Sequence, residues 1–315
     1  MSGGVSVLCP AKLNLYLRVI AREDSGYHQV ETLFQAVDLC DELEVRPGGS
    51  GIALELRSAP AGPLGEVRDD LGDPERNTAM LAARAFFAAT GHEPGVELTL
   101  RKTIPAGTGL GGASSDAAGA LTALNALYGD PLDRPELLEL GGAIGSDVPF
   151  FLAGGASVLA WGRGDRLLVR PPLPPSPVLL VVPDERSSTA SAYRQLSARV
   201  ALPAPPTVLG GAPLGGWRDL AAVQGNDFQR VVFERFPRLG AVRRSLAEAG
   251  AVVARMTGSG TALFGVFTDE ARAATVAAYL IENVESVRVA VIRTLVTTPT
   301  PVSSPLDRFA RLPTV

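Results

Sequence analysis

A glycine-rich turn between a strand-like and a helix-like segment is the feature that most constrains this chain. Residues 96–104 alternate between apolar and polar types, and residues 117–128 carry Ala and Leu at helical spacing. The glycines between them are Gly107, Gly109, Gly111 and Gly112. Glycine lets backbone amides approach a ligand closely, and free amides at a helix start attract phosphate. The segment therefore predicts a phosphate cradle, although its residues are also compatible with a plain tight turn before a capped helix.

Two familiar phosphate-binding patterns do not match this turn. No Lys-Ser or Lys-Thr pair follows the last glycine, as a P-loop requires. No acidic residue closes a second strand about 20 residues later, as in the dinucleotide-binding fingerprint. Ser114, Ser115 and Asp116 are instead suited to opening a helix directly after the glycines.

The composition narrows the class of protein. The chain has 315 residues, 46% of them hydrophobic, which is enough for a sizeable core and two domains. A net charge of −4 without a Lys/Arg run disfavours a nucleic-acid partner, so small molecules are the expected ligands. No apolar run reaches the roughly 18 to 20 residues that cross a bilayer, and no cationic lead precedes the first apolar run, so we expect neither a membrane role nor export. Cys9 and Cys40 are expected to be thiols in a reducing cytoplasm. The oligomeric state is left open.

Two α+β domains and a tail are expected. Residues 1–165 mix strand-like segments with a helix at 77–89 and the cradle. Five prolines within residues 170–177 indicate a crossing between domains, so we place the boundary near residue 165. In residues 166–296 the order of strand-like and helix-like segments suits a small ferredoxin-like layer, interrupted by a Pro/Gly-rich loop at 202–216. Residues 297–315 lack a packing pattern and are expected to be poorly ordered.

Alternation in the first strand places a lysine beside an asparagine. On an ideal strand Lys12, Asn14 and Tyr16 share one face, while the leucines at 13, 15 and 17 share the other. Taken alone, this is compatible with an ordinary polar strand face.

Three further segments are candidates for chemistry. Asp147, which precedes Val-Pro-Phe-Phe, either caps a helix or acts on a substrate proton. His28 follows Tyr27, and a lone histidine is more often structural than functional. Residues 256–261, Met-Thr-Gly-Ser-Gly-Thr, form either a plain hairpin turn or a second glycine loop.

Together these segments resemble the GHMP kinase superfamily, which includes galactokinase, homoserine kinase, mevalonate kinase and phosphomevalonate kinase. The pattern Pro-x-x-x-Gly-Leu-Gly-Gly-x-Ser-Ser-Asp-Ala-Ala, which begins at Pro105, resembles the ATP loop of these kinases. The motifs around Lys12, Tyr27, Asp147 and Gly258 also resemble segments of these kinases. The resemblance as a whole covers about residues 5–295. Within the superfamily, the chain is most similar to the kinases that act on 4-diphosphocytidyl-2-C-methyl-D-erythritol in the non-mevalonate isoprenoid pathway.

The resemblance implies a two-domain α+β fold with an N-terminal domain like domain 2 of ribosomal protein S5 and a ferredoxin-like C-terminal domain. It implies transfer of the γ-phosphate of ATP, with Mg²⁺, onto the 2-hydroxyl of that cytidine diphosphate conjugate. Lys12 would stabilise charge on the moving phosphoryl group, and Asp147 would receive or orient the hydroxyl proton. These two residues, distant in sequence, are therefore expected to meet.

The resemblance also implies which residues bind each ligand. Those expected to contact ATP are Asn77, Pro105, Ala106, Gly107, Thr108, Gly109, Leu110, Gly111, Gly112, Ala113, Ser114 and Ser115. Those expected to contact the acceptor are Asn14, Tyr27, His28, Phe34, Thr189 and Tyr193, with Tyr27 and Phe34 supplying ring surface and His28 a hydrogen bond to the base.

The chain departs from the family pattern at Ala113, where a further glycine is usual, and at Gln29, where glutamate is common. Ala113 raises the question of whether the loop can make its tightest turn. Two alternative functions stay open at this point, namely another small-molecule kinase and a nucleotide-binding sensor without catalysis.

Overall fold

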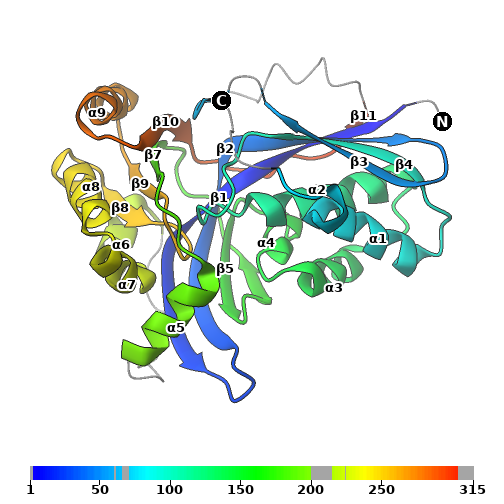
Figure 1. Cartoon of the computed structure of the whole chain (residues 1–315), viewed down its shortest axis with the longest axis horizontal. Coiled ribbons are helices and arrows are strands. Elements are labelled where there is room, and N and C mark those ends of the chain that lie inside the picture. Colours follow the sequence, from blue (N-terminus) through cyan, green and yellow to red (C-terminus); the bar gives the residue numbers. More distant parts are fainter. Residues whose placement is uncertain (1–2, 60–61, 66–70, 200–214, 224, 304–315) are drawn as a thin grey trace.

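The computed structural model describes residues 3–59, 62–65, 71–199, 215–223 and 225–303. Two sheets, each covered by helices, lie side by side along the long axis of the molecule (Figure 1). The α+β class expected from the sequence is confirmed.

The first sheet is built on a long antiparallel hairpin, β1 (Val5–Arg22) and β2 (His28–Pro47). Its strand order is β11-β1-β2-β4-β3, and β5 also pairs with β2, followed by β6. The other strands are β3 (Gly51–Ser58), β4 (Gly95–Lys102), β5 (Ser157–Gly162), β6 (Arg166–Val169) and β11 (Val302–Ser303). The first sheet thus extends to Val169, slightly beyond the domain boundary predicted near residue 165.

Helices cover one face of the first sheet (Figure 1). They are η1 (Pro74–Arg76), α1 (Thr78–Thr90), α2 (Gly112–Leu127), α3 (Arg134–Ile144) and α4 (Val148–Leu152). Helix α2 lies against β1 and β2 and is the most buried of them, with leucines 121 and 124 fully inaccessible. Burial on this scale fixes the first turn of α2, where the glycine cradle ends, relative to the sheet.

The second sheet has the strand order β10-β7-β9-β8 with all neighbours antiparallel. Its strands are β7 (Pro177–Pro183), β8 (Val253–Met256), β9 (Leu263–Val266) and β10 (Val287–Arg293). Its helices are α5 (Thr189–Arg199), α6 (Trp217–Ala222), α7 (Phe228–Arg235), α8 (Pro237–Glu248) and α9 (Glu270–Asn283). The connection of strands and helices is that of a ferredoxin-like layer, as predicted.

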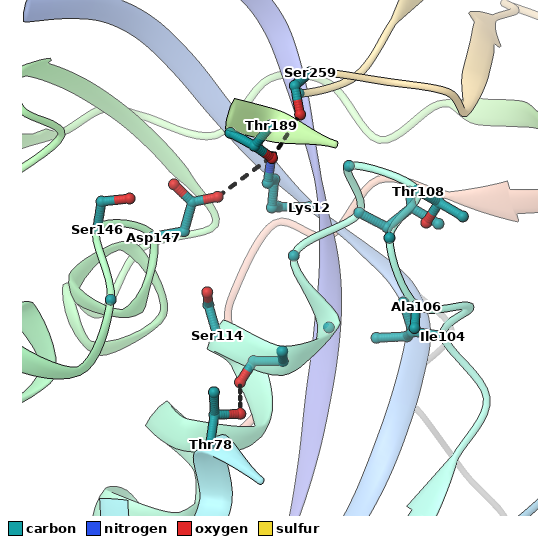
Figure 2. Close-up of a pocket in the computed structure, with 18 of the residues that line it drawn as sticks. Lys12, Thr78, Ile104, Ala106, Thr108, Ser114, Ser146, Asp147, Thr189 and Ser259 are labelled. Carbon is teal, nitrogen blue, oxygen red and sulfur yellow. Dashed lines mark hydrogen bonds and ion pairs between the residues drawn. The ribbon is translucent and has the colours of Figure 1, made fainter. Parts of the chain in front are cut away.

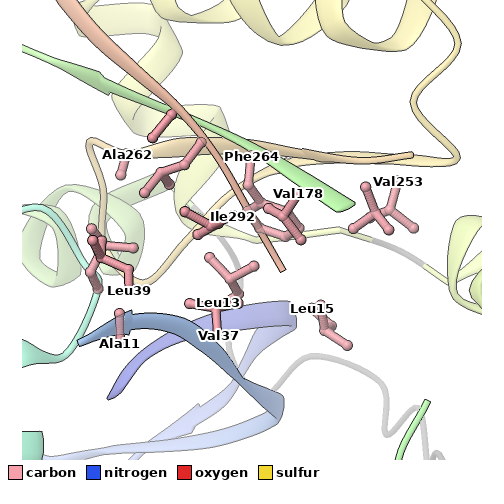
Figure 3. Packing of buried hydrophobic residues seen from close by; sticks show 14 of the residues in the cluster. Ala11, Leu13, Leu15, Val37, Leu39, Val178, Val253, Ala262, Phe264 and Ile292 are labelled. Atoms are coloured by element: carbon pink, nitrogen blue, oxygen red, sulfur yellow. The ribbon is translucent and has the colours of Figure 1, made fainter. Parts of the chain in front are cut away.

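A shared apolar core joins the two sheets. Leu13 and Val37 from the first hairpin pack in one cluster with Val178, Phe264 and Ile292 from the second sheet (Figure 3). Because this cluster is continuous, the strand that carries Lys12 is held between both halves of the molecule.

Two predictions about the ends of segments are changed by the structure. Val302 and Ser303 pair with Ser6 and Val5, so the expectation of a tail without order from residue 297 is wrong for these residues, because the edge of β1 offers them backbone partners. Residues 304–315, and residues 202–214 of the Pro/Gly-rich loop, lie outside the described residues.

Candidate active site

The glycine cradle connects β4 to α2 and turns sharply at three of its glycines. The φ angles of Gly107, Gly109 and Gly111 are 68°, 85° and 77°, a left-handed region that favours glycine. Ala113 lies within α2, where no such angle is required, so its departure from the family pattern leaves the turn intact. The helix begins at Gly112, earlier than the segment 117–128 predicted from leucine spacing.

The first turn of α2 leaves its amides open to a ligand. Gly111 is the N-cap residue and makes no side-chain capping hydrogen bond. The first four N–H groups of a helix have no partner inside it, and the helix dipole makes this end attractive to anions. Since the cap supplies no acceptor, the amides are available to phosphate oxygens.

A second glycine loop, residues 257–260 between β8 and β9, presses against the cradle. A Cβ on Gly109 would lie 2.3 Å from the Thr257 carbonyl oxygen, and one on Gly258 would lie 3.0 Å from Gly109 Cα. The Thr257 hydroxyl donates to the Gly109 carbonyl at 3.2 Å, and the Ala262 amide donates to the Thr108 carbonyl at 3.1 Å. The second-loop interpretation of this segment is therefore confirmed in its geometry.

Lys12 lies where β1 passes beneath the cradle. Its backbone amide donates to the Leu110 carbonyl at 2.9 Å, and its side-chain stem fills the space beside Gly111. The ammonium lies 3.5 Å from the Asp147 carboxylate (Figure 2), and the two side chains are 3% and 33% exposed. The expected meeting of these two residues is confirmed.

Asp147 keeps its carboxylate free for this contact. It occupies the N-cap position of α4 with Pro149 in the first turn, which is the structural role the sequence allowed, but its side chain makes no capping hydrogen bond. The carboxylate therefore faces the buried ammonium and the solvent-accessible cleft rather than the helix backbone.

Burial lowers the pKa of Lys12 from its ordinary value, and the neighbouring Asp147 charge opposes this shift. The ammonium also lies 5.3 Å from the centre of the Phe34 ring. A desolvated cation beside a cleft has a stronger electrostatic effect on a bound anion than one in water.

Asn14 links Lys12 to the second glycine loop. Its carbonyl oxygen accepts hydrogen bonds from the Lys12 ammonium at 2.5 Å and from the Gly258 amide at 2.8 Å. Its amide nitrogen donates to the Thr32 hydroxyl at 2.9 Å. Asn14 lines the cleft, as predicted, but most of its hydrogen-bonding capacity is taken by the protein, so positioning of Lys12 is its evident role.

The predicted alternation along β1 fails after Asn14. A bulge between Asn14 and Tyr16 shifts the pairing with β2 by one residue. Consequently Tyr16 is buried in the core cluster of Leu13 and Leu15, while Leu17 lines the cleft with Lys12 and Asn14. The expectation that Tyr16 shares the face of Lys12, and Leu17 that of Leu13, is wrong for this reason.

A cleft of about 620 Å³ gathers most of the predicted residues. Its lining includes Lys12, Asn14, Phe34, Asn77, all residues from Pro105 to Ser114, Asp147, Thr189 and Tyr193. Among the residues expected to contact ATP, Ser115 alone lies outside this lining, because it is 1% exposed and lines another cavity. Its contact with ATP stays a prediction.

Asn77, at the edge of the cleft, also has a structural role as a helix cap. Its side chain caps α1 by accepting from the Ala79 amide at 2.9 Å. Thr78 beside it donates to the Ala113 carbonyl at 2.6 Å (Figure 2), which ties α1 to the cradle.

A second cavity of about 1000 Å³ adjoins the cleft and contains Tyr27 and His28. The His28 ring stacks on Tyr193 at 4.5 Å between centroids and lies 2.7 Å from the Ser197 hydroxyl of α5. Phe34 is not in this cavity, because it points into the cleft and packs on Phe150 at 4.9 Å. The two rings expected to supply surface for the base therefore lie in different cavities, and their contact with the substrate stays a prediction.

Burial, followed by the nearby Arg22 charge, lowers the pKa of His28. The histidine is thus neutral near pH 7, with one ring nitrogen able to accept a hydrogen bond.

Sequence reasoning missed two groups of charged residues at these cavities. Lys102 in the cleft forms ion pairs with Asp41 and Asp116, which are fully buried beneath the cradle. Arg163 lines both cavities and forms an ion pair with Glu23. Alternation in β2 gave no sign that Asp41 points inward, and the turn that carries Arg163 was considered only as a break between domains.

Within the described residues, no three His, Cys, Asp or Glu side chains are arranged to hold a metal ion. None of the described helices combines the length and apolar content that crossing a bilayer requires.

Comparison with known proteins gives consistent matches. Residues 77–155 match the family "GHMP kinases N terminal domain", and residues 213–286 match "GHMP kinases C terminal". The chain is 38% identical to 4-diphosphocytidyl-2-C-methyl-D-erythritol kinase of Pelotomaculum thermopropionicum, over 87% of this chain and 93% of the relative. It is 39% identical to the same-named protein of Solibacter usitatus, over 82% and 80% of the two chains.

Solved structures agree with these relatives. A crystal structure of 4-(cytidine 5'-diphospho)-2C-methyl-D-erythritol kinase superposes with a TM-score of 0.74 at 34% identity, over 92% of this chain and 98% of the other. Homoserine kinase from Cytophaga hutchinsonii superposes with a TM-score of 0.69 at 19% identity, over 96% and 98%, which shows a shared fold.

Proposed function

Since the chain belongs to the 4-diphosphocytidyl-2-C-methyl-D-erythritol kinases of the GHMP kinase family, we propose that its cleft transfers the γ-phosphate of ATP to the 2-hydroxyl of that substrate. The product is the 2-phosphate, an intermediate of isoprenoid precursor synthesis. The observation that carries this proposal is the pair Lys12 and Asp147, 3.5 Å apart at the mouth of the glycine cradle.

The cradle binds the triphosphate. Its left-handed glycines bring backbone amides close, and the uncapped start of α2 supplies further donors. Asn77 and Thr78 line the cleft, and we assign the adenine to their side of it, because Asn77 matches a family position near the adenine. The second glycine loop holds the cradle in shape from the opposite side.

Asp147 orients the acceptor hydroxyl and takes its proton. The carboxylate is one-third exposed, so a substrate can reach it, and it is already directed toward Lys12. As the oxygen attacks the γ-phosphorus, the bond to the β-phosphate oxygen breaks and ADP leaves. In this class of reaction positioning and charge neutralisation account for most of the rate enhancement, so a strong base is not needed.

Lys12 neutralises charge on the phosphoryl group during transfer. Asn14 and the Leu110 carbonyl fix the side chain and backbone of this lysine, so little reorganisation is needed when charge develops. The low exposure of the ammonium strengthens its effect on the transferred group.

Mg²⁺ fits this donor set as an ion carried mainly by the nucleotide. The cleft offers hard oxygen donors, the Asp147 carboxylate and the Ser114 hydroxyl, but no protein cage in the described residues. Mg²⁺ usually binds through substrate phosphates, waters and one or two carboxylates. When bound, it would neutralise charge on the β- and γ-phosphates.

The second cavity recognises the cytosine base. Tyr27 offers a ring surface that is 60% exposed, and neutral His28 presents a hydrogen-bonding edge. On α5, Tyr193 lines both this cavity and the cleft, and Thr189 lines the cleft. We further propose that the enzyme acts in the cytoplasm, with its free cysteines reduced.

The decisive experiment measures ADP release by the purified protein. The cytidylyl substrate is compared with methylerythritol 4-phosphate, which lacks the cytidine, and with homoserine and mevalonate. Rapid, ATP-dependent release with the first compound alone is expected. Equal turnover without cytosine would refute the substrate assignment, and no turnover with tight ATP binding would favour a nucleotide sensor.

A further inference from the structure

The cleft and the second cavity meet at a narrow junction. Both cavities are lined by Gly145, Ser146, Arg163 and Tyr193. In the proposed function, the base lies in the second cavity and the acceptor hydroxyl in the cleft. The diphosphate that connects these two parts of the substrate must therefore cross this junction.

Arg163 is the only cationic side chain, among the described residues, that lines both cavities. Arg22 and Arg194 line the second cavity alone, and Lys12, Arg76 and Lys102 line the cleft alone. The one carboxylate near Arg163 in the second cavity, Asp165, accepts the Arg163 backbone amide at 2.9 Å. A negatively charged linker that crosses the junction would thus meet the positive charge of Arg163.

The backbone of Arg163 is held in a tight turn, while its side chain is held only by partners at the molecular surface. The residue lies in the turn between β5 and β6, flanked by Gly162 and Gly164 with φ angles of 72° and 95°. Its side chain is 47% exposed and reaches the tip of the β1–β2 hairpin, which extends from the body of the molecule beside α5 (Figure 1).

At that tip the guanidinium lies over the Tyr27 ring and donates hydrogen bonds to the Glu23 carboxylate, through both Nε and Nη2, and to the Ser25 hydroxyl. It lies 4.3 Å from the centre of the Tyr27 ring, and its Nε donates to both Glu23 carboxylate oxygens at 3.1 Å. An exposed ion pair of this kind contributes little net stability, so exchanging one anion for another costs little. Guanidinium groups match phosphate oxygens with paired hydrogen bonds.

We propose that Arg163 is a substrate-specificity residue that exchanges Glu23 for the diphosphate of the acceptor substrate. Glu23 then acts as an internal counter-anion that keeps the guanidinium at the junction when the site is empty. This inference rests on the proposed function and adds to it the residue that distinguishes a nucleoside diphosphate conjugate from a nucleoside.

Calorimetric titration with CDP and with cytidine tests the inference without relying on turnover. In Arg163→Ala, we expect CDP to bind at least about tenfold more weakly and cytidine to bind within about twofold of wild type, since a charged hydrogen-bonding pair is lost. Arg166→Ala is the matched control, because Arg166 is exposed on the neighbouring strand β6 and lines neither cavity. Binding of both compounds to the control should be unchanged.

A second variant tests the exchange itself. Glu23→Gln removes the competing anion, so CDP should bind a few-fold more tightly while cytidine binding stays the same. An equal loss of CDP and cytidine affinity in Arg163→Ala would overturn the inference, because Arg163 would then only support Tyr27. Weaker CDP binding in Glu23→Gln would overturn the exchange.

Steady-state kinetics separate this inference from the proposed function. We expect Arg163→Ala to raise KM for the cytidylyl substrate about tenfold or more and to leave KM for ATP unchanged. A wild-type protein that fails to phosphorylate the substrate would refute the proposed function. An active wild type with an unchanged KM in Arg163→Ala would refute the role of Arg163 alone.

Discussion

The proposed mechanism assigns the proton of the acceptor hydroxyl to the carboxylate of Asp147. Replacing it by asparagine keeps the size of the side chain but removes the charge and the proton acceptor. We expect Asp147→Asn to lower kcat roughly 100-fold or more and to leave ATP affinity nearly intact. Turnover and ATP titration measure the two effects, with Glu139→Gln, an exposed change on α3, as control. Unchanged turnover would remove Asp147 from the mechanism.

The charge state of Lys12 gives a prediction about pH. Burial lowers the pKa of this ammonium from its ordinary value of about 10.4, so the charge is lost earlier as pH rises. The alkaline limb of kcat/KM, which reports the groups of the free enzyme, is therefore expected to lie below about pH 10.4. Lys12→Arg keeps its charge at all these pH values, so any residual activity should lack that limb. If the alkaline limb lies at the same pH in wild type and in Lys12→Arg, a group other than Lys12 causes it.

At the scale of single residues, the sequence indicated the candidate catalytic residues but not the hydrogen bonds and ion pairs that position them. Lys12 and Asp147 could be identified from their motifs, and their proximity in the fold was predicted. The substrate contact expected of Asn14 stays a prediction, and its hydrogen bonds with Thr32 and Gly258 could not be foreseen, because those residues come from distant segments. Arg163 carries no local pattern at all, since only the folding of two hairpins brings it to Tyr27.

The two glycine loops form one element whose close contact can be tested. Alanine at position 109 would combine a left-handed φ of 85° with a Cβ only 2.3 Å from the Thr257 carbonyl oxygen. Gly91 ends α1 at a φ of 70° with no atom near its missing Cβ, so Gly91→Ala carries the backbone strain alone. We expect Gly91→Ala to cost about 1 kcal/mol in stability and to leave KM for ATP unchanged.

Gly109→Ala should cost more stability than Gly91→Ala and raise KM for ATP roughly tenfold, because the cradle must move away from the second loop. Urea unfolding and ATP-dependent kinetics measure the two quantities. Equal behaviour of the two variants would show that contact between the loops does not shape the cradle.

Prediction of the elements succeeded where periodicity is local. The helix expected at 77–89 lies at 78–90, and the order of strands and helices expected for a ferredoxin-like layer is found in the second sheet. The bulge after Asn14 could not be predicted, since the alternation from Leu13 to Leu17 continues unbroken in the sequence. Helix α3 was missed although it has a capping box of Asp133 and Glu136, because its buried face is narrow.

At the scale of the whole molecule, the ferredoxin-like half could be read from the order of its segments. The first sheet could not, because β2 runs from His28 to Pro47 and includes buried polar residues that hide its pattern. Gln35, Asp41 and Glu44 are buried in this strand. Gln35 donates to the Leu295 carbonyl and Asp41 accepts from the Ile104 amide, so the partners of these two residues lie on other segments. Such long-range pairing has no signature in a single sequence.

The buried cluster of Asp41, Lys102 and Asp116 ties β2, β4 and α2 together beneath the cradle. Lys102 bridges the two carboxylates, and Asp41 also accepts the Ile104 amide at 2.8 Å. One ammonium cannot neutralise two buried carboxylates. Burial, together with the Asp41 charge, therefore raises the pKa of Asp116 to about 8, although Lys102 opposes the shift.

This shift predicts how stability changes with pH. Because the folded pKa of Asp116 lies above its unfolded value of about 3.9, the native state holds an extra proton between these pH values. The free energy of unfolding should then fall as pH rises toward about 8, by on the order of 2 kcal/mol between pH 6 and pH 9. Asp116→Asn stays neutral throughout and should lose less stability over the same interval. Urea unfolding at both pH values, with Glu139→Gln as the surface control, measures the difference. If the free energy of unfolding falls equally in wild type and Asp116→Asn, Asp116 is already ionised at pH 6. The cluster beneath the cradle would then be charged at that pH.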